Sequence, residues 1–86
     1  MRPVIVTTSH RGVFFGYADD TRGDQVVLTD ARMAIRWGTT GGILQLAQTG
    51  PTKLSKIGSP APRIELRSIT AVIDVTTEAE AAWKAA

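Results

Sequence analysis

The chain has 86 residues, no cysteine and a formal net charge of +2 from ten basic and eight acidic side chains. These values exclude a disulfide framework, a thiolate metal site and a protein that coats duplex DNA by neutralising many phosphates. A domain of this size buries only about 60% of its unfolded surface, so we expect one domain over residues 1–86 that gains stability as a homo-oligomer. No apolar run reaches membrane-span length and no signal peptide is visible, so we expect a cytoplasmic protein without a membrane partner.

The N-terminal part predicts two bent strands. Residues 4–8 are β-branched and favour a strand, and residues 13–18 predict a second strand, preceded by Gly12 and bent at Gly16. Strand glycines mark bulges, sharp bends or close backbone approach, so we predict a mainly β (α+β) fold: a small, strongly bent antiparallel sheet or a small barrel. His10 is predicted to be a turn residue, and three aromatic residues are predicted to lie in the core: Phe14, Phe15 and Tyr17.

The next segment predicts two further strands. Residues 19–24 form a polar loop that we interpret as a solvated turn without a metal site, and residues 25–29 form a strand that breaks at Asp30-Ala31. Residues 32–37 alternate with Met33 and Ile35 on one face, which predicts an amphipathic strand ending at Trp37.

The middle of the chain is less regular. The glycine-rich loop at 38–42 lacks the lysine of a phosphate-binding P-loop. Residues 43–48 fit a helix or a strand. We predict a short helix, capped by Thr39 or Thr40 and stopped by Gly50-Pro51. Residues 52–57 predict a short strand, and residues 58–62 predict a stiff, proline-rich connector.

The C-terminal part predicts two strands and a helix. Residues 63–67 and 69–75 both alternate, with Ile69, Ile73 and Val75 on one face of the second strand, but the two registers disagree by one residue. We therefore expect a bulge or sharp turn at Ser68. Residues 77–80 form a capping-box pattern before an alanine-rich helix at about 77–85, whose Trp83 must dock on its own domain or on a neighbouring subunit.

The chemistry favours a binding protein. No nucleophile–base pair, metal-ligand cluster or cofactor motif stands out, so we expect no enzyme activity, no metal and no cofactor. Arg32, Arg36 and Arg67 are expected on outward strand positions, where guanidinium groups could bind phosphate and the Trp37 ring could stack on a base. Arg67 also borders the irregularity at Ser68, where free backbone N–H groups favour an anion.

The whole chain resembles a family of small, uncharacterised bacteriophage and prophage proteins. The similarity extends over residues 4–8, 10–17, 31–33, 49–53, 57–58, 66–67 and 70–72. This resemblance implies a phage protein acting in the cytoplasm of an infected bacterial cell and implies no particular activity.

A local resemblance links residues 12–16, 24–31 and 64–73 to the two signature segments of Sm-like RNA-binding barrels. In that family an asparagine and an arginine-glycine pair line a uridine pocket on a ring. The resemblance places Gln25 at the asparagine position and Arg67-Ser68 at the arginine-glycine position. The N-terminal helix of that family is missing, and Ser68 replaces the glycine.

Three hypotheses follow. In the first, a homo-oligomeric phage accessory protein captures a small phosphate-bearing, nucleotide-type ligand in pockets between its subunits and so sequesters an immune signal of the host. In the second, the protein is an Sm-like regulator that binds single-stranded RNA, and in the third it is a structural or host-protein-binding module. The candidate ligand-binding residues are Gln25, Arg32, Arg36, Trp37, Arg67 and Ser68.

Overall fold

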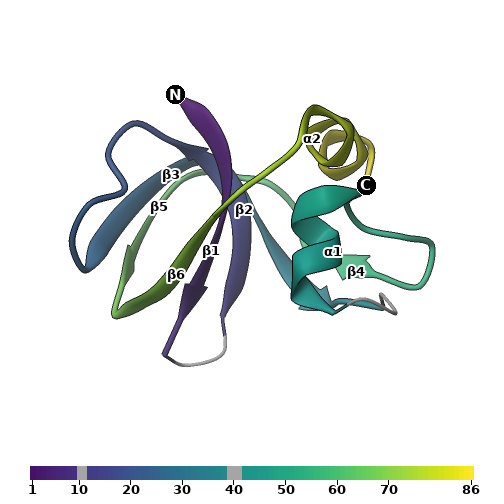
Figure 1. Cartoon of the computed structure of the whole chain (residues 1–86), viewed down its shortest axis with the longest axis horizontal. Coiled ribbons are helices and arrows are strands. Elements are labelled where there is room, and N and C mark those ends of the chain that lie inside the picture. The colour runs from purple at the N-terminus through teal and green to yellow at the C-terminus, as the bar shows by residue number, and fades with distance from the viewer. Residues whose placement is uncertain (10–11, 39–41) are drawn as a thin grey trace.

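The computed structural model describes residues 1–9, 12–38 and 42–86 and shows a mainly β, α+β fold (Figure 1). The predicted turn residue His10 and the predicted caps Thr39 and Thr40 lie outside the described residues. The elements in chain order are β1 (Arg2–Thr8), β2 (Val13–Ala18), β3 (Gln25–Arg36), α1 (Ile43–Gln48), β4 (Lys56–Ile57), β5 (Ala61–Arg67), β6 (Ile69–Asp74) and α2 (Thr77–Ala85).

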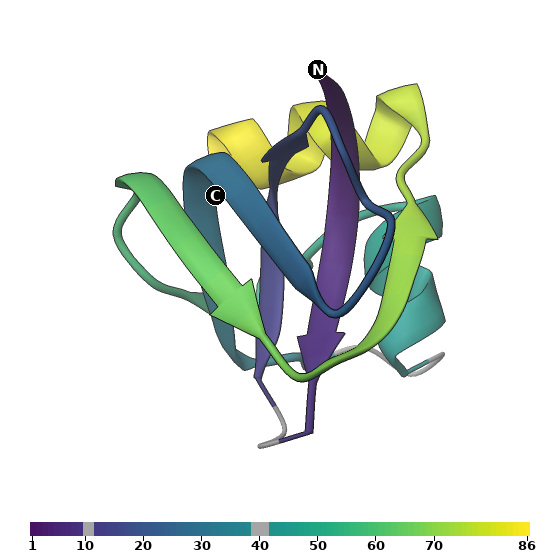
Figure 2. The ribbon, with the colours of Figure 1, turned by 90° about the vertical axis from the view of Figure 1, so that its left-hand side faces the viewer.

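The strands form one antiparallel sheet in the order β4-β3-β2-β1-β6, with β5 also paired to β3. The long strand β3 pairs with both β5 and β4. Its first half pairs with β5, from Gln25 opposite Arg67, and its end pairs with β4, where Arg36 lies opposite Lys56. The sheet curls strongly, as Figures 1 and 2 show. Among the described residues no ladder joins β5 to β6, so the predicted bent sheet is confirmed as an open sheet, not a closed barrel.

The predicted break at Asp30-Ala31 is wrong, because β3 is one strand of 12 residues. Asp30 adopts a positive φ of 50°, and the register between β2 and β3 shifts between Phe15 and Tyr17. An extra residue in the left-handed conformation is accommodated as a bulge that bends a strand without ending it. The bulge therefore lets β3 curve while it keeps its ladders on both sides.

Gly16 allows β2 and β3 to approach closely, as the sequence predicted. A Cβ atom at this position would lie 2.8 Å from the Cβ of Leu28. Any side chain at position 16 would therefore push β3 away from β2. The predicted irregularity at Ser68 is also confirmed, since its φ of 58° turns the chain between β5 and β6.

Both faces of the sheet are covered. Along each strand, alternate side chains point to opposite faces of the sheet. The side chains on one face form an inner cluster inside the curl, and those on the other face pack against the two helices. The central strand β1 is buried on both sides, with Val4 and Val6 in the inner cluster and Ile5 in the helix-side cluster. On β6 the pairing with β1 shifts register at Thr7/Thr8. Ile69 consequently packs in the inner cluster and Ile73 in the helix-side cluster, contrary to the prediction of one shared face.

Trp83 docks α2 onto its own sheet. Its ring is fully buried, stacks on Phe15 with centroids 5.0 Å apart, and donates its Nε1–H to the Leu46 carbonyl at 3.0 Å. One side chain thus joins β2, α1 and α2. Phe15 is buried, and Phe14 and Tyr17 pack partly buried against the two clusters, so the predicted aromatic core is confirmed.

The helix start differs from the predicted capping box by one residue. Thr76 is the N-cap, and its hydroxyl accepts the Ala79 N–H at 3.1 Å. Glu80 does not take part in the helix cap. Its carboxylate instead accepts a hydrogen bond from the Tyr17 hydroxyl at 2.5 Å, and Lys84 lies 3.6 Å from Glu80 and 5.6 Å from the Tyr17 ring centroid. These contacts form a second tie between β2 and α2.

The middle segment and the far end of β3 also depart from the sequence prediction. Only Lys56–Ile57 of the expected strand at 52–57 pairs with β3, and the expected connector at 58–62 already enters β5 at Ala61. Met33 and Ile35 share a face as predicted, but that face is exposed. No helix among the described residues is long and apolar enough to cross a membrane.

Replacing Trp83 by alanine should lower the free energy of unfolding by about 3–5 kcal/mol, because it leaves a cavity at a fully buried position and removes the hydrogen bond that the Leu46 carbonyl accepts. Trp83→Phe keeps a stacking ring and should cost less. Trp37→Phe is the matched control, since that ring is 42% exposed and its change should stay within about 0.5 kcal/mol. Urea unfolding monitored by circular dichroism measures all three. Equal small losses at positions 83 and 37 would contradict the central role of Trp83.

The tie between Tyr17 and Glu80 should weaken at high pH. Burial, and then the hydrogen bond to Glu80, raise the pKa of Tyr17 above its ordinary value of 10.0. A raised pKa stabilises the fold below the unfolded pKa, and this contribution is lost as the pH rises through the folded pKa. The Tyr17 contact also raises the pKa of Lys84, which acts in the same direction.

We therefore expect Tyr17→Phe to cost about 0.5–1.5 kcal/mol at about pH 8, where the hydroxyl is neutral, and less at about pH 11. Urea unfolding of both proteins at the two pH values measures the difference. A wild-type advantage that is the same at both values would show that the Tyr17 hydroxyl does not carry this pH dependence.

Candidate anion-binding groove

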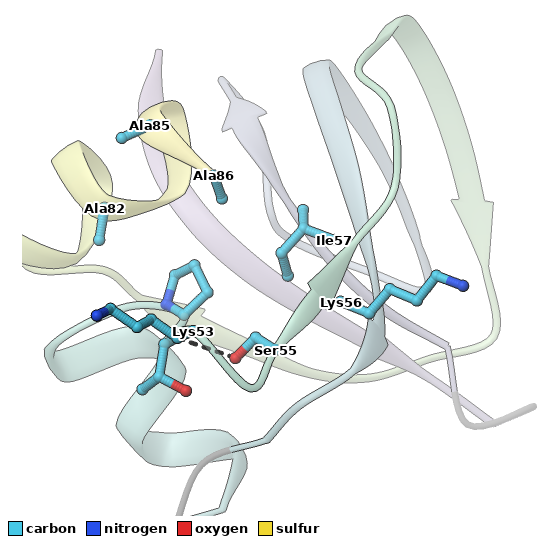
Figure 3. Close-up of a pocket in the computed structure, with 9 residues that line it drawn as sticks. Lys53, Ser55, Lys56, Ile57, Ala82, Ala85 and Ala86 are labelled. Atoms are coloured by element: carbon cyan, nitrogen blue, oxygen red, sulfur yellow. Dashed lines mark hydrogen bonds between the residues drawn. The ribbon is translucent and has the colours of Figure 1, made fainter.

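A groove of about 610 Å³ lies between the segment before β5 and the last turns of α2 (Figure 3). This volume falls in the range of small-molecule sites. Two lysines and two hydroxyl groups border a floor of small apolar side chains. The lining residues are Pro51, Thr52, Lys53, Ser55, Lys56, Ile57, Ala82, Ala85 and Ala86.

Hydrogen bonds hold the lysine-bearing side of the groove in place. The Thr52 N–H donates to the Ser55 hydroxyl oxygen at 2.9 Å, and the Ser55 N–H donates to the Thr52 carbonyl at 3.0 Å. The two hydroxyl groups then bond to the main chain directly after β3: Ser55 donates to the Trp37 carbonyl, and Thr52 donates to the Gly38 carbonyl at 3.0 Å. Residues 52–55 are therefore a closed turn attached to the sheet.

Gly50 sets the other wall of the groove. Its φ of 87° is in the left-handed region, and a Cβ atom there would lie 2.5 Å from the Cβ of Ala82. Glycine at position 50 and alanine at position 82 together let the chain after α1 pass directly beneath α2. The groove opens beyond this contact, so its shape depends on how α2 is docked.

The cations near the groove differ from most others in the chain. Five basic side chains form ion pairs with acidic residues, namely Arg2, Arg22, Arg63, Arg67 and Lys84. Among the described residues, four basic side chains form no such pair: Arg32, Arg36, Lys53 and Lys56. Arg32 is bonded to main-chain oxygens, whereas Arg36 lies opposite Lys56 in the β3–β4 ladder. The unneutralised positive charge of the described surface is thus concentrated around the groove.

The two groove lysines do not close on one point. Both are exposed, and in Figure 3 their side chains extend in opposite directions on either side of the Ser55 hydroxyl group, with Lys56 directed away from α2. An anion with a single charge would contact one of them at a time. The arrangement instead matches a ligand whose negative charges are separated.

The structure brings together three of the residues predicted from the sequence. Gln25 and Arg67 are direct cross-strand partners, and Ser68 follows Arg67 at its positive φ. Arg67 is exposed and lies 3.6 Å from Glu65, which also pairs with Arg63 at 3.3 Å. The two arginines on this face therefore share one carboxylate, which reduces the charge available to a ligand.

Arg32 occupies a structural position. Its Nε–H donates to the Gly58 carbonyl at 3.0 Å, and its Nη1 donates to the main-chain oxygens of Trp83, at 3.1 Å, and Ala86. The guanidinium group thus satisfies carbonyl groups at the C-terminal end of α2, as basic side chains at helix ends do. It also borders a smaller cavity of about 260 Å³ beside Tyr17 and Lys84.

Arg36 and Trp37 lie at the far end of β3 from Gln25. Arg36 is exposed near Lys56, and the carbonyl of Trp37 holds the turn that carries Lys53. The ring of Trp37 faces a separate apolar cavity of about 390 Å³ together with Thr7, Val13 and Ile43. The six predicted residues therefore do not form one site.

The sequence prediction omitted Lys53 and Lys56 from its candidate site. A usable signal was present, because residues 31–64 contain no acidic side chain at all. That stretch includes the groove lysines and Arg36, whereas Arg63 and Arg67 flank Glu65. The described residues contain no group of three histidine or acidic side chains placed to hold a metal ion.

Comparisons with known proteins identify a family but no activity. Neither a curated protein nor a solved structure matches the chain. Residues 1–83 match a family described as a domain of unknown function, DUF6948. Because that match extends over nearly the whole sequence, the chain belongs to the DUF6948 family.

Proposed function

We propose that this protein binds a small, phosphate-bearing ligand of nucleotide type in the groove between residues 51–57 and α2, without converting it chemically. The observation that carries the proposal is the concentration of cations without an acidic partner around that groove, among the described residues. A concave surface with positive charge and exposed donors attracts anions, and lysine is a common phosphate ligand.

The groove favours a ligand with at least two separated negative charges. Lys53 and Lys56 extend to opposite sides (Figure 3), so each contacts a different part of the ligand. The floor of proline, isoleucine and alanine side chains has no aromatic ring on which a base could stack. Recognition therefore depends on phosphates held by the lysines and on sugar hydroxyl groups that donate to the Thr52 and Ser55 oxygens, because both of these hydroxyl groups already donate their own hydrogens to main-chain carbonyls.

The biological setting of this proposal comes from the sequence. A chain that resembles small phage proteins and holds a nucleotide-type ligand without converting it would act by sequestration in the infected cell. Capture of a host immune signal is the form of this proposal that we favour. The amount of protein, not its turnover, would then determine how much ligand is withdrawn.

Alanine at Lys53 or Lys56 should weaken binding of a cyclic dinucleotide, and the double variant should weaken it at least about tenfold, because each lysine contacts a separate charge. For the same reason the two losses should be additive in free energy. Isothermal titration calorimetry with a cyclic dinucleotide, with ADP-ribose and with inorganic phosphate measures both effects. Inorganic phosphate should bind most weakly of the three.

Arg22→Ala is the matched control, because it also removes one positive charge and its side chain is 92% exposed in a loop. It should leave binding within about twofold of the wild type. The proposed site is wrong if the Lys53 and Lys56 variants bind the cyclic dinucleotide as tightly as the Arg22 variant. Thermal unfolding of each variant checks that the fold is kept.

A second candidate function, binding of single-stranded RNA, is favoured by the direct pairing of Gln25 with Arg67 beside Ser68. These are the residues to which the Sm-like resemblance assigns uridine contact. In this case oligouridine should bind with a steep salt dependence, because several phosphates are neutralised. Arg67→Ala should weaken it about tenfold while Arg63→Ala has little effect. Equal, small effects of both substitutions in a fluorescence titration would eliminate this candidate.

A further inference from the structure

β6 is an end strand of the sheet, and among the described strands its outer edge is unpaired. Its other edge pairs with β1. In Figure 2, β6 forms the right-hand margin of the sheet, with α1 behind it. The backbone N–H and C=O groups on that margin are therefore placed to pair with another chain.

The other outer strands carry features that discourage such pairing. β5 contains Pro62 and alternates charged side chains at Arg63, Glu65 and Arg67, whereas β4 has two residues, one of which is Lys56. Proline, charge and short length are the usual protections of a sheet edge. β6 has the sequence ITAVID, with neither proline nor a basic residue.

The apolar side chains of β6 are incompletely covered in the single chain. Ile69, Ala71, Val72 and Ile73 are all half-buried. On the neighbouring strand β1, Val4, Ile5 and Val6 have no exposed surface. A strand added outside β6 would give its side chains the flanking neighbours that β1 already has.

We propose that the outer edge of β6 pairs with β6 of a second copy of this chain, antiparallel and about a two-fold axis. The two ends of the strand carry opposite charges, since Arg67 lies just before its first residue and Asp74 is its last. Within the chain Arg67 pairs with Glu65 and Asp74 pairs with Arg2, but both side chains are largely exposed, and such surface ion pairs are weak enough to exchange partners. Antiparallel pairing brings Asp74 of each copy to the Arg67 end of the other, which gives two equivalent attractive contacts. Such an interface is closed at two copies.

Analytical ultracentrifugation tests the assembly, and hydrogen exchange tests the strand. At tens of micromolar the protein should sediment with twice the 9.2 kDa mass of the chain. The amides of β6 that face away from β1 should be protected there and should exchange faster on dilution below the dimer dissociation constant. A monomer, a larger assembly, or a dimer whose outer β6 amides exchange freely would each overturn the proposal.

Charge reversal at the strand end tests the direction of pairing. Asp74→Arg should weaken the dimer about tenfold, because both attractive contacts become repulsive. Adding Arg67→Asp should restore it. Asp20→Arg is the matched control, an equal charge change in the loop before β3 that should leave the dimer unchanged. The antiparallel arrangement is wrong if Asp74→Arg behaves like this control, or if Arg67→Asp does not rescue it.

Circular dichroism confirms that the variants are folded, and ligand binding in the groove should be unaffected.

Discussion

The docking of Trp83 is the interaction on which the rest of this structure depends. A terminal helix of nine residues is too short to be stable in isolation. Stacking on Phe15 and the hydrogen bond to the Leu46 carbonyl fix it against β2 and α1 together. The same docking positions Ala82 and Ala85, which form one wall of the groove, and brings the end of α2 within reach of Arg32. Loss of Trp83 would therefore remove a groove wall as well as core packing.

The curled, open sheet is the second constraint. Gly16 and the bulge at Asp30 let β3 bend closely around β2, and the bent strand presents different partners at its two ends. One end holds the Gln25–Arg67 pair, and the other holds Arg36 beside Lys56. Because the sheet does not close, it also leaves β6 with a free edge. The proposed ligand groove and the proposed dimer edge thus lie in separate parts of the molecule.

Much of the fold could be predicted from local patterns. The β-branched runs, the strand glycines and the register change at Ser68 indicated the bent sheet, and the alanine-rich end indicated α2. Asp30 was misjudged because a left-handed residue resembles a strand end in sequence, although tertiary pairing on both sides keeps β3 continuous. The site was harder to predict. Arg32 has the chemistry of a phosphate ligand, but its hydrogen bonds to α2 come from residues 51 and 54 positions later in the chain.

The central claim is that the groove beside α2, and not the Arg67 end of the sheet, receives an anionic ligand. Nuclear magnetic resonance mapping of backbone amide shifts during titration with a cyclic dinucleotide tests it most directly. We expect the largest shifts on residues 52–57 and on the last turn of α2. Shifts concentrated at Gln25, Arg67 and Ser68, with the groove amides unchanged, would contradict it.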